Sequence, residues 1–225
     1  MISFNVPMKF RGKHAAYAHY LSTDKGQKRV GGVNVFSRII DAYMVSILVG
    51  LKYSRTAPMN SDAIYYKDVF DNSKEYGDKT VSSSDINSET MMASGKLLNY
   101  IYRIVMLNEN VRGLNDEEKI ANAFKSENDE QRLKDNIELM NSFSRGGLEI
   151  LYERFQGLSG KDDEIREMQL ELFDDMSGYT NELLWKFKVV TSLCVFQPFL
   201  VFDKIKEPEW ALSRNGNVEK VNWKG

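Results

Sequence analysis

Apolar side chains occupy thirteen of the twenty positions of residues 35–54, the most hydrophobic continuous stretch of the chain. A helix with so few polar positions has no face for water and is buried on nearly all sides. Arg38 and Asp41 interrupt its first half and lie three residues apart, close enough to pair on a helix. The uncharged run 42–51 is well short of the ~20 residues that cross a membrane. The pattern therefore predicts a central core helix over about 35–54.

Other segments repeat apolar residues at intervals of three and four, the spacing of one helix face. A tract rich in Asp, Asn, Ser, Lys, Gly and Thr, residues 71–84, is predicted to be a loop. The predicted helices are a short one over 63–70 capped by Asn60 or Ser61, a long one from Asp85 or Ser88 to about Asn108, a short one from a cap at Asn115 to about Ser126, a long one through 133–155, and a long one from Asp162 to at least Lys188.

Two glycines, Gly146 and Gly147, lie inside the segment 133–155. They either kink or break a helix there, since each costs about 1 kcal/mol relative to alanine, or they let a second helix cross closely. The three-and-four spacing does not slip across them, so we favour a continuous helix with a close crossing.

The two ends of the chain have other patterns. Residues Ile2 to Phe10 alternate loosely and contain Pro7, which suits an edge strand. The run 189–202 is too apolar for periodicity to decide between a helix kinked at its proline and a helix end followed by a strand. Asn215 and Gly216 predict a type I′ hairpin in the tail.

These patterns predict a mainly α fold, a single helical domain around the buried central helix with small β additions at the N- and C-termini. We divide it into a basic aromatic arm with an edge strand (1–34), expected to be flexible or ordered by a partner, a helical core (35–190), and an apolar segment with a C-terminal hairpin packed on the same domain (191–225).

Charge is divided unevenly along the 225 residues. The formal net charge is −2, but residues 1–38 carry about +6 and the remainder about −8. Cys194 is the only cysteine, so no internal disulfide forms, and with two histidines there is no zinc-binding cluster. The first residues lack the apolar core of a secretory signal. A cytoplasmic protein without a membrane span is expected.

The sequence contains no recognisable catalytic motif. The carboxylates fall in surface runs, without the Glu-x-x-His pattern of helical metal sites, and Gly31 and Gly32 lack the spacing of a phosphate-binding loop. His14 and His19 are five residues apart and so on different faces of a helix. We therefore expect no cofactor, no metal and no catalytic residue. The alternative is an enzyme whose site is assembled from scattered residues, with these two histidines as first candidates.

A basic segment interleaved with aromatic residues remains as the candidate binding site. Lysine and arginine neutralise phosphates and exposed tyrosine rings stack on bases, so nucleic acid is one target. The interpretation we favour is contact with the chain's own acidic helices or with an acidic protein. The candidate residues are Lys9, Arg11, Lys13, Tyr17, Tyr20, Lys25, Lys28 and Arg29.

Four stretches carry a resemblance to a group of known proteins: Gly50-Leu51-Lys52-Tyr53-Ser54-Arg55, Leu97 to Leu107, Ala121 to Lys125, and Gly146 to Phe155. In this order they resemble small helical accessory proteins encoded beside large ATPases in bacterial anti-phage defence loci. The resemblance implies a non-catalytic subunit that scaffolds or regulates an ATPase or nuclease partner, and it assigns no functional residue.

The leading hypothesis is thus an interaction subunit of an intracellular multi-protein complex. It would use the basic aromatic arm and the apolar C-terminal segment as contact surfaces for a protein partner, a large ATPase or nuclease subunit. A nucleic-acid-binding module using the arm is the first alternative, and an enzyme is the second.

Overall fold

Helix α2 (Ile39–Lys52) lies at the centre of the molecule, and twelve of its fourteen residues are buried. The computed structural model describes residues 2–23, 28–71, 76 and 78–187. The predicted central helix is confirmed but begins later, because Phe36 runs extended and bridges to Ser22. Arg38 precedes the first helical residue, and its Nη2 lies 2.7 Å from the carboxylate of the buried Asp41.

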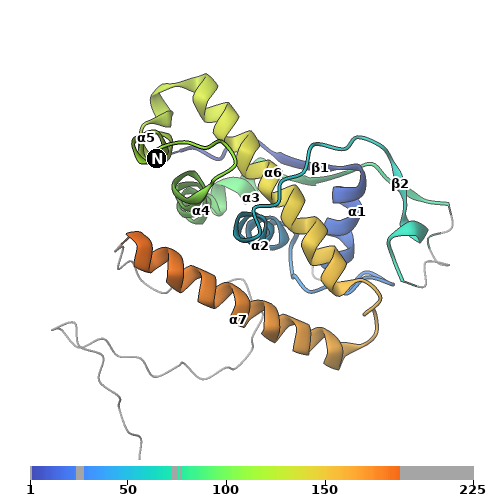
Figure 1. Cartoon of the computed structure of the whole chain (residues 1–225). Helices are drawn as coiled ribbons and strands as arrows, with labels where there is room; N and C mark the ends of the chain where they lie inside the picture. Colours follow the sequence, from blue (N-terminus) through green and yellow to red (C-terminus); the bar gives the residue numbers. More distant parts are fainter. Residues whose placement is uncertain (1, 24–27, 72–75, 77, 188–225) are drawn as a thin grey trace, which may run out of the picture.

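The described chain is mainly α, with two small two-stranded sheets, which confirms the predicted fold class (Figure 1). In chain order the elements are β1 (Met8–Arg11), α1 (Gly12–Leu21), α2 (Ile39–Lys52), β2 (Ile64–Tyr65), β3 (Thr80–Val81), β4 (Ser83–Ile86), α3 (Ser88–Ala93), α4 (Gly95–Asn108), α5 (Asp116–Phe124), α6 (Glu130–Phe155) and α7 (Asp162–Phe187), with 3-10 turns at Tyr66–Asp68 and Ser126–Asn128.

Helices α2 and α6 form the most extensive contact among the described elements. Helix α6 is continuous, as predicted, and its glycines lie at the crossing. A Cβ atom on Gly147 would collide with the carbonyl oxygen of Ser46, and one on Gly50 would collide with that of Phe143. Hydrogen at these positions lets the two backbones touch, which is the close crossing inferred from the sequence.

The N-terminal segment differs from the flexible or partner-ordered arm that we expected. Strand β1 covers only the end of the predicted strand Ile2 to Phe10 and pairs antiparallel with β4. Helix α1 follows at once, and seven of its ten residues are buried. Gly12 permits this turn with a φ of +52°, where a Cβ would meet Asn60 and Asp62. The physical reason is the alanine-rich face of α1, which packs closely on the core.

The predicted helix over 63–70 is wrong. Ile64 and Tyr65 form β2, which pairs with β3, and a single 3-10 turn follows. The side chain of Asn60 accepts a hydrogen bond from the backbone of Asp62 instead of capping a helix. The predicted loop 71–84 is also wrong at its end, because β3 and the start of β4 lie there and bury Val81. Backbone pairing with β1 and β2 outweighs the polar composition.

The later helices agree more closely with the sequence patterns. The second long helix is divided at Ser94 into α3 and α4, and Asn87 caps α3 through the backbone N–H of Thr90. Asn115 and Glu118 form the predicted capping box of α5. Helix α7 begins at Asp162, as predicted. The tail hairpin and the run 189–202 lie outside the described residues.

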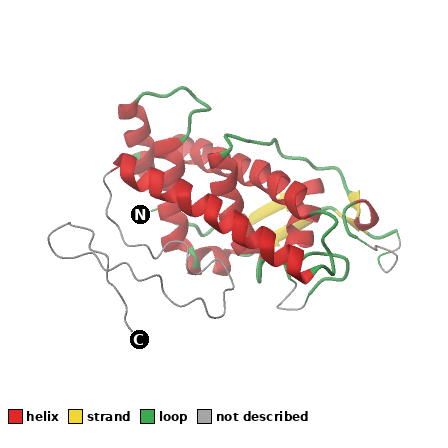
Figure 2. Cartoon of the chain, turned by 60° about the horizontal axis from the view of Figure 1, so that its bottom comes forward, coloured by secondary structure: helices red, strands yellow, loops and turns green. Residues whose placement is uncertain are grey.

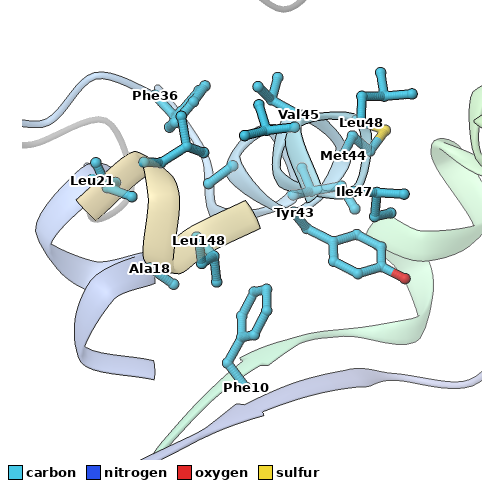
Figure 3. Packing of buried hydrophobic residues seen from close by; sticks show 14 of the residues in the cluster. Phe10, Ala18, Leu21, Phe36, Tyr43, Met44, Val45, Ile47, Leu48 and Leu148 are labelled. Atoms are coloured by element: carbon cyan, nitrogen blue, oxygen red, sulfur yellow. The ribbon is translucent and has the colours of Figure 1, made fainter. Parts of the chain in front are cut away.

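The elements surround α2 from several sides. In Figures 1 and 2, α6 crosses α2 and the long helix α7 runs along one side of the body, while the β1–β4 sheet lies on another. Figure 3 shows Phe10 of β1, Ala18 and Leu21 of α1, and Leu148 of α6 around the side chains of α2. The rings of Phe10 and Tyr43 meet edge to face at 6.0 Å between centroids. The core therefore joins both halves of the chain.

Candidate functional site

Glu149 of α6 gathers three basic side chains from distant parts of the chain. Its Oε1 lies 2.7 Å from Nζ of Lys13 and 3.1 Å from Nε2 of His14, both in the first turn of α1. Its Oε2 accepts from Nη2 of Arg55 at 2.9 Å and from Nε at 3.2 Å. The carboxylate is 12% exposed, so these partners replace most of its water. We call these four residues the Glu149 cluster.

The turn that ends α2 positions Arg55 in this cluster. Ser54 takes a left-handed conformation with a φ of +51°, and the N–H of Arg55 donates to the carbonyl of Gly50 at 2.8 Å. The chain reverses there over α6, close to Gly146. Arg55 also reaches Glu153, one turn after Glu149, at 2.8 Å. The cluster thus joins α1, the end of α2 and α6.

Burial sets the charge state of His14, and hydrogen bonds set that of Glu149. Burial lowers the pKa of His14 to about 4, against the hydrogen bond to Glu149, which favours the charged form. Burial alone would raise the pKa of Glu149, but hydrogen bonds from Lys13 and His14 outweigh it and lower that pKa below its usual value. At pH 7 the carboxylate is ionised and the imidazole is neutral, so Nε2–H of His14 donates to Glu149.

A histidine next to a carboxylate is an arrangement used in acid–base catalysis. Here the His14 side chain is only 1% exposed, and its Nδ1 has no hydrogen-bond partner among the described residues. A ring closed off in this way cannot exchange a proton with a bound substrate. His19 is not part of the cluster, because its Nδ1 lies 3.0 Å from the hydroxyl of Tyr66.

Three basic residues of the candidate binding site lie against carboxylates of three different elements. Lys9 lies 3.4 Å from Asp85 on β4, Lys13 belongs to the Glu149 cluster, and Lys28 lies 3.9 Å from Asp162 at the start of α7. Arg29 is half-buried, and its backbone bonds the side chain of Asn34. The remaining two are Arg11, exposed at the end of β1, and Lys25, which lies outside the described residues.

The two candidate tyrosines face inward. Tyr17 stacks on Tyr152 of α6 with 4.1 Å between ring centroids, so one of its faces is occupied. Tyr20 is completely buried, and its hydroxyl lies 2.7 Å from the carboxylate of Asp71. The hydroxyl of Tyr20 also accepts a hydrogen bond from the N–H of Gly157. The ring of Tyr20 cannot stack on a base.

A shallow recess lies beside the first turn of α7. Its volume is about 170 Å³, and its lining includes Lys28, Arg29, Ser159 and Asp162. Pockets that enclose small molecules usually measure about 300 Å³ or more. The recess is therefore too small for a cofactor or an organic substrate of ordinary size.

Helices α4 and α5 expose three large apolar side chains. Arg103 connects the two helices, because its guanidinium carbon lies 5.1 Å from the ring centroid of Phe124. Exposed fractions are 43% for Tyr100, 49% for Ile120 and 53% for Phe124. Leu97, Ile104 and Leu107 of α4 are partly buried and share one helix face with Tyr100. We define this α4–α5 face as Leu97, Tyr100, Ile104, Leu107, Ile120 and Phe124.

The sequence pattern predicted apolar faces for these two helices and did not separate exposed apolar residues from buried ones. In α4 the buried stripe is Leu98, Ile101 and Val105, and the α4–α5 face lies next to it on the same helix. In α5 only Asn122 and Ala123 are buried, so Ile120 and Phe124 are left outside. An apolar arc on α4 wider than a single stripe was the available signal. No local signal could have paired Glu149 with residues 94 and 135 positions away.

Comparison with known proteins adds no relationship. No protein-family model, no curated protein and no solved structure matches the chain. Within residues 2–187, as far as they are described, no group of three or more His, Cys, Asp or Glu could hold a metal ion. Among the described helices, each is too short or too polar to cross a membrane.

Proposed function

We propose that this chain is a non-catalytic interaction subunit of a multi-protein assembly and that the α4–α5 face contacts its protein partner. The observation that carries the proposal is the exposure of Tyr100, Ile120 and Phe124 on two packed helices, where Phe124 of α5 contacts Arg103 of α4. Contiguous apolar surface on a folded protein is typical of protein-binding sites, and aromatic residues supply much of the energy in such interfaces.

The other surfaces support a protein partner over the alternatives. The basic residues Lys9, Lys13 and Lys28 lie against carboxylates of the same chain, which reduces the charge available to nucleic acid. His14, the first catalytic candidate, is closed off from solvent. These observations favour an interaction subunit over a nucleic-acid-binding module and over an enzyme.

The resemblance to accessory subunits of bacterial anti-phage defence suggests the kind of partner. Two of its four stretches, 97–107 and 121–125, contribute five of the six residues of the α4–α5 face and include Arg103. The other two, 50–55 and 146–155, meet at the α2–α6 crossing and in the Glu149 cluster. We therefore propose a cytoplasmic complex in which the partner is a large ATPase or nuclease subunit.

The test is co-purification of the tagged full-length chain from its native host, with nuclease treatment and a high-salt wash. The wild type should recover a stoichiometric protein partner. The double variant Ile120→Ser/Phe124→Ser should lose it, because it removes two of the three most exposed apolar side chains from the face.

The control variant is Tyr65→Ser. Tyr65 is 43% exposed, as Tyr100 is, but it lies on β2 at the end of the molecule opposite α5 (Figure 1). It should recover the partner as the wild type does. Recovery of no stoichiometric protein by the wild type, or equal recovery by the double variant, would contradict the proposal.

A further inference from the structure

We infer that the α4–α5 face is the docking site for residues 189–206 of the same chain, which cover it in the free protein. The inference rests on the proposed function in one respect, since the same face is the partner surface and the partner must then displace the segment.

The chain leaves α7 at the end of the molecule that holds the face. In Figures 1 and 2, the C-terminal end of α7 lies on the same side of the body as α5, while its N-terminal end lies far from it. Leu183, one turn before the end of α7, is buried. From Phe187 the chain reaches Cys194 within about 24 Å when fully extended, which is enough to span neighbouring helices.

The segment has the composition of a buried element. Ten of the fourteen residues 189–202 are apolar, four of them being phenylalanine or leucine after Val195, and none is charged. Such a run is stable in water only when another apolar surface covers it. It is too short to cross a membrane. The α4–α5 face offers exposed apolar surface on the side of the body where α7 ends (Figure 1).

Cys194 makes the inference directly testable, because it is the only thiol of the chain and lies in the middle of the segment. The single variants Tyr100→Cys, Ile120→Cys and Phe124→Cys each add a second thiol on the exposed face. The purified full-length variants are oxidised mildly at micromolar concentration. A disulfide forms only between residues whose Cα atoms approach within about 7 Å.

At least one face variant should form an intramolecular disulfide about tenfold faster than the control Tyr65→Cys, which carries its thiol at the far end of the molecule. Mass spectrometry of non-reduced peptides identifies the bond, and the same variants with Cys194→Ser should form none. Predominantly intermolecular disulfides would overturn the inference in favour of a second copy on the face. Failure of all three face variants to exceed the control, with both thiols open to a thiol reagent, would also overturn it.

This experiment separates the inference from the proposed function, because it needs no partner. If no intramolecular disulfide forms while Ile120→Ser/Phe124→Ser loses its partner, only the docking of the segment is wrong. If the disulfide forms and no partner is recovered from the host, the face serves the chain itself and the proposed function is wrong.

Discussion

At the scale of single residues, substitution of Gly147 tests how closely α2 and α6 cross. In Gly147→Ala the added methyl group would overlap the backbone of Ser46, so one of the two helices must shift. We expect the free energy of unfolding to fall by about 2 kcal/mol or more, as in overpacked cores. Urea unfolding followed by circular dichroism measures it.

The same substitution at Gly178 supplies the control. Gly178 lies within α7 with nothing near the position of an added Cβ. Gly178→Ala should raise the free energy of unfolding by about 0.5–1 kcal/mol, because alanine favours a helix. If both substitutions shifted stability in the same direction, the crossing would not be as close as described.

His14 predicts a dependence of stability on pH. Its pKa is lowered to about 4 in the folded chain, whereas an unfolded histidine has a pKa near 6.5. The unfolded state therefore binds more protons between these values, and stability is lost as the pH falls through them. From pH 7 to pH 5 this histidine should account for a loss of about 2 kcal/mol.

The measurement is urea unfolding at both pH values for the wild type, His14→Gln and His19→Gln. His14→Gln should remove most of the loss between pH 7 and pH 5, whatever its stability at pH 7. His19→Gln removes a histidine that lies at Tyr66 and outside the cluster, and it should leave the contribution of His14 in place. An unchanged pH dependence in His14→Gln would show that the ring is not held neutral by burial.

At the scale of elements, the Glu149 cluster fixes α1 and the end of α2 to α6. In Glu149→Gln the charges of Lys13 and Arg55 lose a carboxylate that is largely removed from water. We expect the free energy of unfolding at pH 7 to fall by about 2–3 kcal/mol, because breaking a buried pair leaves charges uncompensated. Chemical denaturation measures this change.

Glu153→Gln is the matched control, since it removes an equal charge from the same helix one turn later. Glu153 is 53% exposed, and an exposed pair with Arg55 contributes less than about 1 kcal/mol. Equal losses in the two variants would mean that the cluster does not join the elements more strongly than an ordinary surface ion pair.

The elements that the sequence predicted correctly carry their signal locally. The capping box at Asn115, the acidic first turn of α7 and the uninterrupted spacing through Gly147 each act within a few residues. The elements that it missed depend on distant partners. Residues Ile64 and Tyr65 are a strand because of β3, and the N-terminal segment is ordered because β4 and α6 cover it.

In the candidate site, too, the sequence predicted local features and missed those that depend on distant partners. Lys13 was recognised as a candidate binding residue, but its partner Glu149 lies 136 positions away in a helix whose pattern indicated only core and solvent faces. The α4–α5 face was visible as apolar spacing, yet spacing alone does not say which of two adjacent stripes finds a covering element. Which stripe is exposed depends on where α2 and α5 pack.

At the scale of the whole molecule, part of the charge division along the chain is paired within the fold. Lys9, Lys13 and Lys28 of the basic N-terminal segment lie against carboxylates of β4, α6 and the start of α7. These carboxylates compete with phosphates for three of the candidate basic side chains.

This arrangement predicts weak and unspecific nucleic-acid binding. A module that neutralised phosphates with six basic residues would show a log–log slope of affinity against salt of about −5, whereas we expect a slope shallower than about −2. Fluorescence anisotropy with a single-stranded and a duplex oligonucleotide measures the affinity at each salt concentration.

One triple variant carries Gln at three exposed positions of the segment: Lys9, Arg11 and Lys28. The control carries Gln at three lysines elsewhere: Lys96, Lys125 and Lys161. Both should change the affinity equally and little. A steep slope lost only in the first variant would restore the nucleic-acid module, because paired surface charges would then have exchanged their carboxylates for phosphates.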